Sequence, residues 1–294
     1  QFRNFTNKLY NASNFLTLNV DTFPDLKDIN IQTPLGLYMQ SKLSHAVDEV
    51  RSSLDSYKFN EAASTLYRFV WMEFCDWGIE YSKASKESSV ELGSLFKETL
   101  KMVSPFMPFI SDYLYHKLSG TTLENGDSLM IMNFPKDIKK DENIENMFSI
   151  IEEAIIAIRR AKTLIDMGNS KIEKAYLKLD VKIDEDVAKP FIEKLAKVEN
   201  IEFVNSKVEN SITDVSNNLE VYIPTSAIDM KPIIEKLEKQ QEKAQKEFDK
   251  LNGMLSNERF VANAPANVIE ENTKALEDVK SRLEKIETEL KSLA

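Results

Sequence analysis

The fold of this chain is decided by residues 58–83, KFNEAASTLYRFVWMEFCDWGIEYSK. Apolar side chains recur here in steps of three and four residues, which places them on one face of an α-helix. This face consists of Phe59, Ala63, Leu66, Val70, Phe74, Trp77 and Tyr81. The pattern predicts a helix that buries this face in the core of a helical bundle. Core packing is also expected of Phe69 and Trp71.

Further helices are expected on both sides of this segment, and together they define a helical bundle over residues 1–135. Residues 2–18 carry apolar side chains at helical spacing, and another helix is predicted to begin at Pro34, a residue pre-set for a first helical turn. A helix over residues 90–103 is interrupted at SPFMP, residues 104–108, where two prolines each remove a backbone donor. We therefore expect a kink or two abutting helices there.

The rest of the chain divides into a small α/β unit and a coiled coil. Residues 136–228 are expected to form a linker helix at 144–167, strands at 175–181, 201–204 and 219–224, and a second helix at 186–198. Residues 229–294 contain two heptad segments joined by a short stretch with Pro265, and Asn272 occupies a core heptad position. Two such segments predict an antiparallel coiled-coil hairpin. The expected fold class is mainly α.

Composition excludes several classes of protein. The net charge is −10, seven glycines are scattered without forming a phosphate-binding loop, and no apolar run is long enough to span a membrane. The single cysteine, Cys75, excludes a disulfide scaffold, and two distant histidines, His45 and His116, argue against zinc or triad chemistry. We expect a cytoplasmic chain without catalytic residues, metal or cofactor. Its start at Gln1 suggests a fragment.

Three motifs resemble the anticodon-binding helical domain of class I aminoacyl-tRNA synthetases of the valine, isoleucine and leucine group. They are NKLYNASNF at residues 7–15, EFCDWGIE at 73–80 and PFMPFI at 105–110. Between the heptad segments, LSNERFVANAP at residues 255–265 is similar to the terminal arm of the valyl-tRNA synthetase family. The strand that precedes that arm resembles LEVYIP at 219–224. The chain departs from the family at Tyr10, where tryptophan is common, and at Asn14, where a basic residue is frequent.

The resemblance implies the tRNA-recognition part of a ligase that uses ATP, with Mg²⁺, to join valine to its tRNA. Residues 1–135 would bind the anticodon, 136–228 would space the parts, and 229–294 would form a tRNA-binding arm. Neither ATP-handling signature of the family is present. SKASK at 82–86 resembles one of them only superficially. The resemblance thus places the active and editing sites upstream and implies a monomer with no DNA or membrane partner. Two alternatives remain: the same region of an isoleucyl- or leucyl-tRNA synthetase, and a coiled-coil scaffold that binds a protein helix.

Candidate RNA contacts in the bundle lie on the first helix and in the loop after it. Arg3, Lys8 and Asn11 offer hydrogen-bond donors on that helix, and a solvated helix face is the alternative. Phe23 lies in a polar stretch where burial is not imposed, so its ring is a candidate for stacking on an unpaired base. Local loop packing is the alternative for Phe23.

Candidate contacts outside the bundle are lysines and arginines. The densest basic cluster comprises Arg159, Arg160 and Lys162, which we expect either to meet the anticodon stem or to form salt bridges within the protein. In the arm the candidates are Lys246, Lys250 and Lys274. Lys250 and Lys274 are preferred as phosphate contacts, because the resemblance implies that the arm touches the outer corner of the tRNA. Solubility and helix pairing are the alternative role for such lysines.

Overall fold

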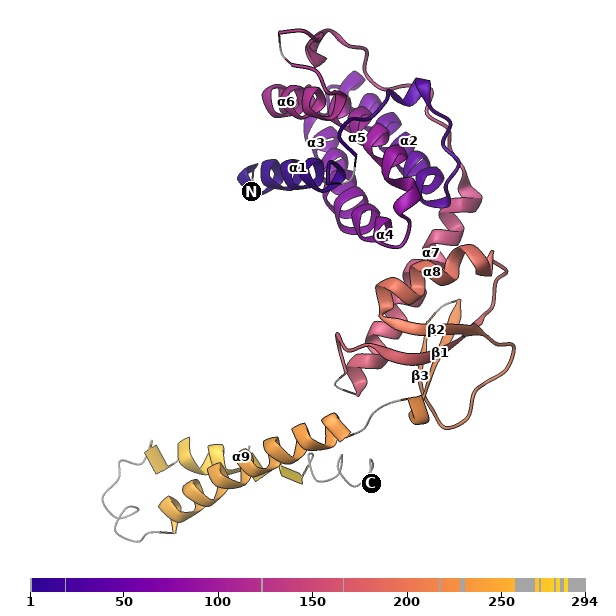
Figure 1. Cartoon of the computed structure of the whole chain (residues 1–294). Coiled ribbons are helices and arrows are strands. Elements are labelled where there is room, and N and C mark those ends of the chain that lie inside the picture. Colours follow the sequence, from indigo (N-terminus) through magenta and orange to yellow (C-terminus); the bar gives the residue numbers. More distant parts are fainter. Residues whose placement is uncertain are drawn as a thin grey trace.

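The structure is a computed structural model that describes residues 2–18, 20–122, 124–165, 167–216, 218–227, 231–256, 268–269, 271–277, 279–280 and 283–284. Figure 1 shows a helical bundle, a small sheet covered by helices, and a long helix, α9, that extends away from the sheet. The bundle helices are α1 (Phe2–Leu16), α2 (Pro34–Asp55), α3 (Phe59–Arg68), α4 (Ile79–Ser82), α5 (Ser89–Val103) and α6 (Pro108–Ser119). Short 3₁₀ turns are η1 (Leu26–Asp28), η3 (Lys86–Ser88) and η4 (Leu129–Ile131).

The segment that decides the fold is helical throughout but contains a π-helix, η2 (Phe69–Gly78), between α3 and α4. Because π turns are wider than α turns, the buried stripe advances in steps of four. Its members are Ala62, Leu66, Val70, Phe74, Gly78 and Ser82. The prediction that Phe59 and Ala63 lie in the core is wrong: both are exposed, because Ala62 takes the inward position at the start of α3. Trp71 and Trp77 are half-buried, whereas Phe69 is fully buried.

The prolines at residues 105 and 108 separate two helices rather than kink one. Val103 ends α5, and Pro108 occupies the first turn of α6, where its missing N–H costs nothing. Gly120 ends α6 in the left-handed conformation, with φ of 69°. The expectation of two abutting helices is therefore confirmed.

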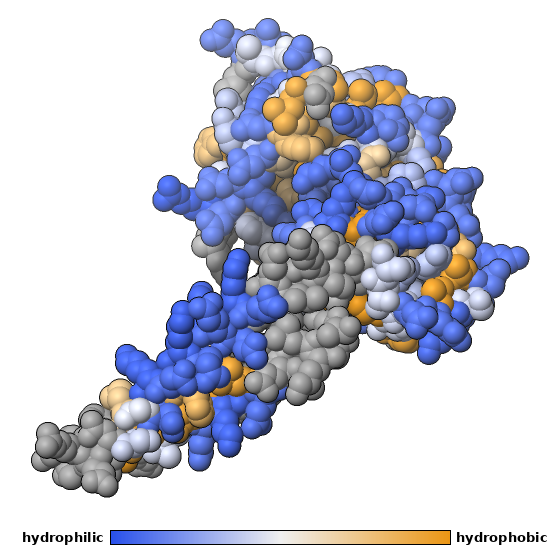
Figure 2. Space-filling view, turned by 60° about the horizontal axis from the view of Figure 1, so that its bottom comes forward, coloured by the Kyte–Doolittle hydropathy of each residue, from blue (hydrophilic) through white to orange (hydrophobic). Residues whose placement is uncertain are grey.

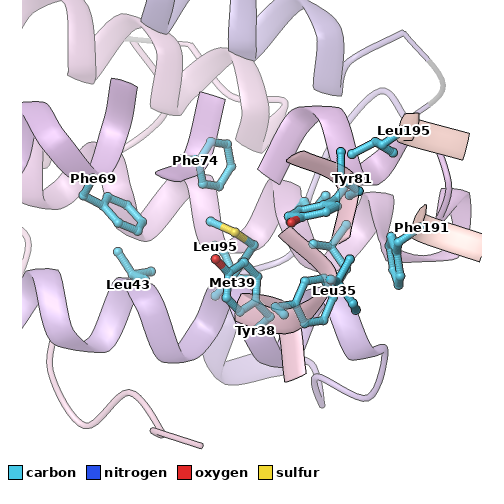
Figure 3. Close-up of a cluster of buried hydrophobic side chains, with 14 of the residues drawn as sticks. Leu35, Tyr38, Met39, Leu43, Phe69, Phe74, Tyr81, Leu95, Phe191 and Leu195 are labelled. Carbon is cyan, nitrogen blue, oxygen red and sulfur yellow. The ribbon is translucent and has the colours of Figure 1, made fainter. Parts of the chain in front are cut away.

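The core of the bundle continues into the region that follows it. In Figure 3, Phe191 and Leu195 lie beside Tyr81, although they come from a helix more than 100 residues further along the chain. The rings of Tyr81 and Phe191 meet edge to face with centroids 5.6 Å apart, and Tyr38 stacks on Phe148 at 4.3 Å. One continuous hydrophobic core therefore joins the bundle to the α/β unit.

The α/β unit holds a four-stranded mixed sheet in the order β2-β1-β4-β3. Its elements are α7 (Glu142–Leu164), β1 (Ile172–Leu179), α8 (Glu185–Ala196), β2 (Val198–Phe203), β3 (Ser211–Val215), β4 (Leu219–Pro224) and η5 (Thr225–Ala227). The strands β1 and β2 are parallel and joined by α8, while β4 runs antiparallel to both β1 and β3. The sequence missed β3, because this edge strand, SITDV, has no fully buried residue and so no clear alternation.

The last helical part begins with α9 (Lys231–Leu255). The described residues of 268–284 are also helical. Ala244 of α9 is buried together with Val279 and Leu283, and Phe248 and Leu251 pack against them. Within each segment these residues are three or four positions apart, the spacing of the heptad segments expected from the sequence. The cluster supplies a small core separate from that of the sheet. The segment predicted to join the two heptad helices lies outside the described residues. Figure 2 shows a mainly hydrophilic surface on the described part of the region that projects from the rest of the molecule.

Candidate nucleic-acid interface

The outward face of α1 carries amides and a cation. This helix turns Phe5, Leu9, Ala12 and Leu16 into the core, at the spacing of one helical face. The opposite face therefore exposes Arg3, Asn7 and Asn11. No hydrogen bond within the described residues holds these three side chains, so all three are available to a ligand.

One flank of this face is an aromatic stack topped by Lys8. The Lys8 ammonium lies 4.5 Å from the ring centroid of Trp71 and 2.5 Å from Oδ1 of Asp76. Trp71 stacks on Tyr67 at 5.4 Å, and Tyr67 stacks on Phe5 at 5.4 Å. The Tyr67 ring is 40% exposed, so the stack offers an aromatic surface beside the amides of α1. Lys8 therefore remains a candidate RNA contact on this surface, although its ion pair with Asp76 neutralises part of its charge.

The other flank comes from α6, and the sequence reasoning missed it. Lys117 donates a hydrogen bond to Oδ1 of Asn14 at 2.5 Å, and its Nζ lies 5.5 Å from the ring centroid of Tyr10. The Tyr10 ring is 43% exposed. An ammonium group thus stands beside Asn14, supplied by another helix. Only the tertiary structure brings Lys117 there, since 103 residues separate it from Asn14.

Phe23 lies in the core, so the expectation of a loop ring free for base stacking is wrong. Its ring is 3% exposed and packs directly on Gly93, where an added Cβ would lie 2.0 Å from Cδ1 of Phe23. Lys97 donates to the Phe23 carbonyl at 2.9 Å and pairs with Asp25 at 2.7 Å. Burial acts to raise the pKa of Asp25, but the hydrogen bond and charge of Lys97 prevail and lower it. These contacts hold the loop against α5.

The basic cluster of α7 contacts other parts of the protein. The salt-bridge alternative is met by one of its three residues, and the other two donate to backbone carbonyls. Arg159 donates to the Leu195 carbonyl at 2.9 Å and Lys162 to the Ala196 carbonyl at 2.9 Å, so both cap the C-terminus of α8. Arg160 pairs with Asp214 of β3 at 2.7 Å. Lys162 is 1% exposed, which contradicts a role in direct RNA contact. Burial, with the nearby charges of Lys197 and Arg159, lowers the pKa of Lys162 to about 8.

The arm lysines differ from one another in their surroundings. Lys246 pairs with Glu242 one helical turn away at 2.6 Å, which matches the pairing role typical of coiled-coil flanks. Lys250 and Lys274 are exposed, and no ion pair with another described residue involves either of them. Asn272 donates to the Val268 carbonyl at 2.7 Å, which is a contact within its own helical segment.

Reactive chemistry is not assembled in the described part of the chain. Burial raises the pKa of the Cys75 thiol to about 12, so the thiolate that a nucleophile requires does not form near neutral pH. Within the described ranges, no group of three or more His, Cys, Asp or Glu side chains is placed to hold a metal ion. None of the helices described is long and apolar enough to cross a membrane.

The helical bundle presents exposed amides, partly exposed aromatic rings and a few cations. Side chains of these kinds are typical of proteins that bind unpaired nucleotides. Comparison with known families agrees with this class: residues 37–177 match the anticodon-binding domain of tRNA ligases. Residues 229–294 match the tRNA-binding arm of valyl-tRNA synthetase. The chain belongs to the valyl-tRNA synthetase family.

Individual relatives support the same assignment. The chain is 53% identical, over 99% of its length, to a valine–tRNA ligase of Nitratiruptor sp., and it covers 33% of that protein. It is 50% identical over 99% of its length to the enzyme of Wolinella succinogenes, again covering 33%. Over 92% of its length it is 54% identical to the enzyme of Campylobacter jejuni, of which it covers 32%. The chain thus spans about a third of the length of the curated relatives it matches.

Proposed function

We propose that this chain recognises valine tRNA for a valine–tRNA ligase, with the bundle contacting the anticodon loop and the arm bracing the outer corner of the L-shaped RNA. The observation that carries the proposal is the exposed face of α1, where the amides of Asn7 and Asn11 lie between two partly aromatic flanks. Amide side chains donate and accept hydrogen bonds at base edges, and the rings of Tyr10 and Tyr67 offer stacking surfaces. The protein that contains this chain would join valine to its tRNA with ATP and Mg²⁺ supplied at sites outside this chain.

The charge of the chain restricts how it binds RNA. A net charge of −10 opposes general attraction to phosphates, so affinity has to come from a few placed cations and from stacking. On the bundle these cations are Arg3, Lys8 and Lys117. In this proposal phosphate contacts set the position of the RNA, and the bases that reach α1 set the choice of anticodon.

For the arm, we propose that residues 229–294 form an antiparallel coiled-coil hairpin. The packing of Ala244, Phe248 and Leu251 against Val279 and Leu283 supports this arrangement, because both sides contribute heptad positions. Lys250 and Lys274 would then contact phosphates. We also propose the division of the chain into a bundle over 1–135, a linker and α/β unit over 136–228, and the arm, within a cytoplasmic and monomeric protein that has no DNA or membrane partner.

The first test measures retention of labelled tRNA on a filter by the whole chain. Valine tRNA should be retained more strongly than a transcript with its anticodon swapped, and more strongly than isoleucine tRNA, which addresses the isoleucyl alternative. Equal retention of the native and swapped transcripts would contradict anticodon reading by the bundle.

The arm is tested separately with Lys250→Glu/Lys274→Glu. We expect this double variant to weaken binding and to lower the salt dependence, because two phosphate contacts are lost. Lys239→Glu/Lys280→Glu is the matched control, since it makes the same charge change on the same two segments. If both double variants lose affinity equally, the effect is general repulsion and Lys250 and Lys274 are not contacts. Deleting residues 231–294 distinguishes a tRNA arm, whose loss lowers tRNA affinity, from a scaffold, whose loss removes a protein partner.

A further inference from the structure

A pocket of about 310 Å³ lies where the bundle meets the α/β unit, and three lysines line it. They are Lys83 at the end of α4, Lys86 in η3 and Lys194 on α8. The remaining lining comes from Phe15 and Leu16 of α1, Ser82 of α4, and Ser89 and Leu92 of α5. Its positive side chains therefore converge from three separate elements, two of which are more than 100 residues apart in sequence.

The pocket carries an uncompensated positive charge. None of its lining residues is an aspartate or glutamate, in a chain whose net charge is −10. Lys83 pairs with Glu80 at 2.5 Å on the exposed side of α4. Lys86 and Lys194 are both exposed, and among the described residues neither forms an ion pair. Two ammonium groups that line one pocket without a carboxylate in its lining favour a bound anion there.

The dipole of α5 adds to the same preference. This 15-residue helix begins at Ser89, which lines the pocket, and no side chain caps its N-terminus. The Ser88 hydroxyl that precedes it donates instead to the Ser85 carbonyl at 2.6 Å. The N–H and the hydroxyl of Ser89 both donate to the Lys86 carbonyl. The helix therefore contributes through its dipole, whose positive end favours a bound anion beside the lysines.

The position of the pocket favours an RNA backbone over a small free anion. Phe15 is one helical turn beyond Asn11, so both lie on the same face of α1, about 6 Å apart along its axis. An RNA strand covers that distance within about two nucleotides. We propose that this pocket binds a backbone phosphate of the same RNA whose unpaired bases contact α1, and that Lys86 and Lys194 are the phosphate ligands. The inference rests on the proposed function and adds to it a contact that the arm and the face of α1 do not supply.

The SKASK stretch at residues 82–86 thereby acquires a role. Three of the pocket's lining residues, Ser82, Lys83 and Lys86, come from it. Its two lysines belong to different elements, because Lys83 follows the end of α4 and Lys86 begins η3. Both nevertheless line the same pocket. The hydroxyl of Ser82 donates to the Ile79 carbonyl at 2.7 Å, and that of Ser89 donates to the Lys86 carbonyl at 2.6 Å. The side-chain donors left for phosphate oxygens are therefore the lysines.

The experiment compares Lys86→Gln/Lys194→Gln with Lys136→Gln/Lys182→Gln in the whole chain. The control removes two exposed lysines outside the pocket, so both variants make the same charge change. For valine tRNA at about 150 mM salt, we expect the pocket variant to raise Kd about three- to tenfold, with a salt slope lower by about 1. The control should bind like the unmodified chain, and Lys86→Arg/Lys194→Arg should keep most of the affinity.

The outcomes separate this inference from the proposed function. If the unmodified chain fails to bind valine tRNA, the proposed function fails. If it binds and the pocket variant matches the control in Kd and slope, only the pocket inference is overturned. A titration with inorganic phosphate, followed by the amide resonances of Ser89 and Leu92, distinguishes the source of the phosphate. Perturbation of these resonances together with an unchanged RNA affinity in the pocket variant would assign the pocket to small phosphates and contradict the RNA assignment.

Discussion

The outward face of α1 and the C-terminal turns of α7 both carry basic side chains, but these side chains differ in their contacts with the rest of the protein. On α7 three cations within four residues bind carbonyls of α8 and a carboxylate of β3. Around α1 the cations are fewer and come from different elements, yet Arg3 is exposed and Lys117 stands beside the exposed Tyr10 ring. The density of basic residues along the sequence therefore does not show which of them are free to bind a ligand. What matters is whether neighbouring elements present carbonyls or carboxylates to those residues.

The largest effect that sharpens this comparison is expected for Lys162→Met. The variant keeps most of the side-chain volume but leaves the Ala196 carbonyl without its donor. Near pH 10.5, where the buried amine is neutral and no charge has to be desolvated, the free energy of unfolding should therefore fall by about 1–2 kcal/mol. Urea titration measures the loss. Affinity of the folded variant for tRNA should not change. Normal stability together with weakened tRNA binding would show that Lys162 of α7 contacts RNA. It would contradict the conclusion that the cations of α7 bind only the protein.

The same residue predicts a pH dependence. Burial lowers the pKa of Lys162 from 10.5 to about 8, so between these values the unfolded chain holds the proton more tightly than the folded chain. The contribution of Lys162 to the free energy of unfolding therefore rises with pH from about 8 and levels off above 10.5. Subtracting the urea-derived stabilities of Lys162→Met from those of the unmodified chain across this range isolates the contribution. A flat difference would contradict the burial of a charged amine.

On the α1 side, Tyr10→Leu tests the stacking surface. Leucine covers similar apolar area but offers no π face, so we expect affinity for valine tRNA to fall about fivefold, or about 1 kcal/mol, with stability nearly unchanged. Tyr10→Phe is the matched control and should bind normally. Equal losses in both variants would assign the effect to the hydroxyl, and no loss in either would remove Tyr10 from the interface.

The smallest effect is expected for Arg160→Gln. Its ion pair with Asp214 joins a half-exposed guanidinium to a carboxylate that is 17% exposed, and such pairs contribute at most about 1 kcal/mol. Thermal unfolding should shift by a few degrees at most, and tRNA affinity should not change. A tenfold loss of tRNA affinity would instead show that Arg160 leaves Asp214 for a phosphate, and the comparison with α1 would fail at this residue.

The sequence by itself determined the helical bundle, the break between α5 and α6, the approximate positions of α7, α8, β1, β2 and β4, and the heptad contacts of the arm. Each of these rests on a local periodicity or on a proline, and such signals survive without knowledge of distant contacts. The motifs also identified the family. The sequence did not predict the edge strand β3, because a strand that is half-buried on both faces shows no alternation of apolar and polar residues.

Only the tertiary structure decided which polar and aromatic side chains face outward. Phe23 reads as a loop residue in sequence, but Gly93 leaves a space that its ring fills. From the sequence, Lys162 could either contact RNA or form a salt bridge, but in the structure it donates to a carbonyl at the end of α8. Lys117 gave no signal, yet α6 brings it to Asn14. In each case the partner is between 30 and about 100 residues away, so the free energy that orients the side chain comes from packing between elements and leaves no trace in the local sequence pattern.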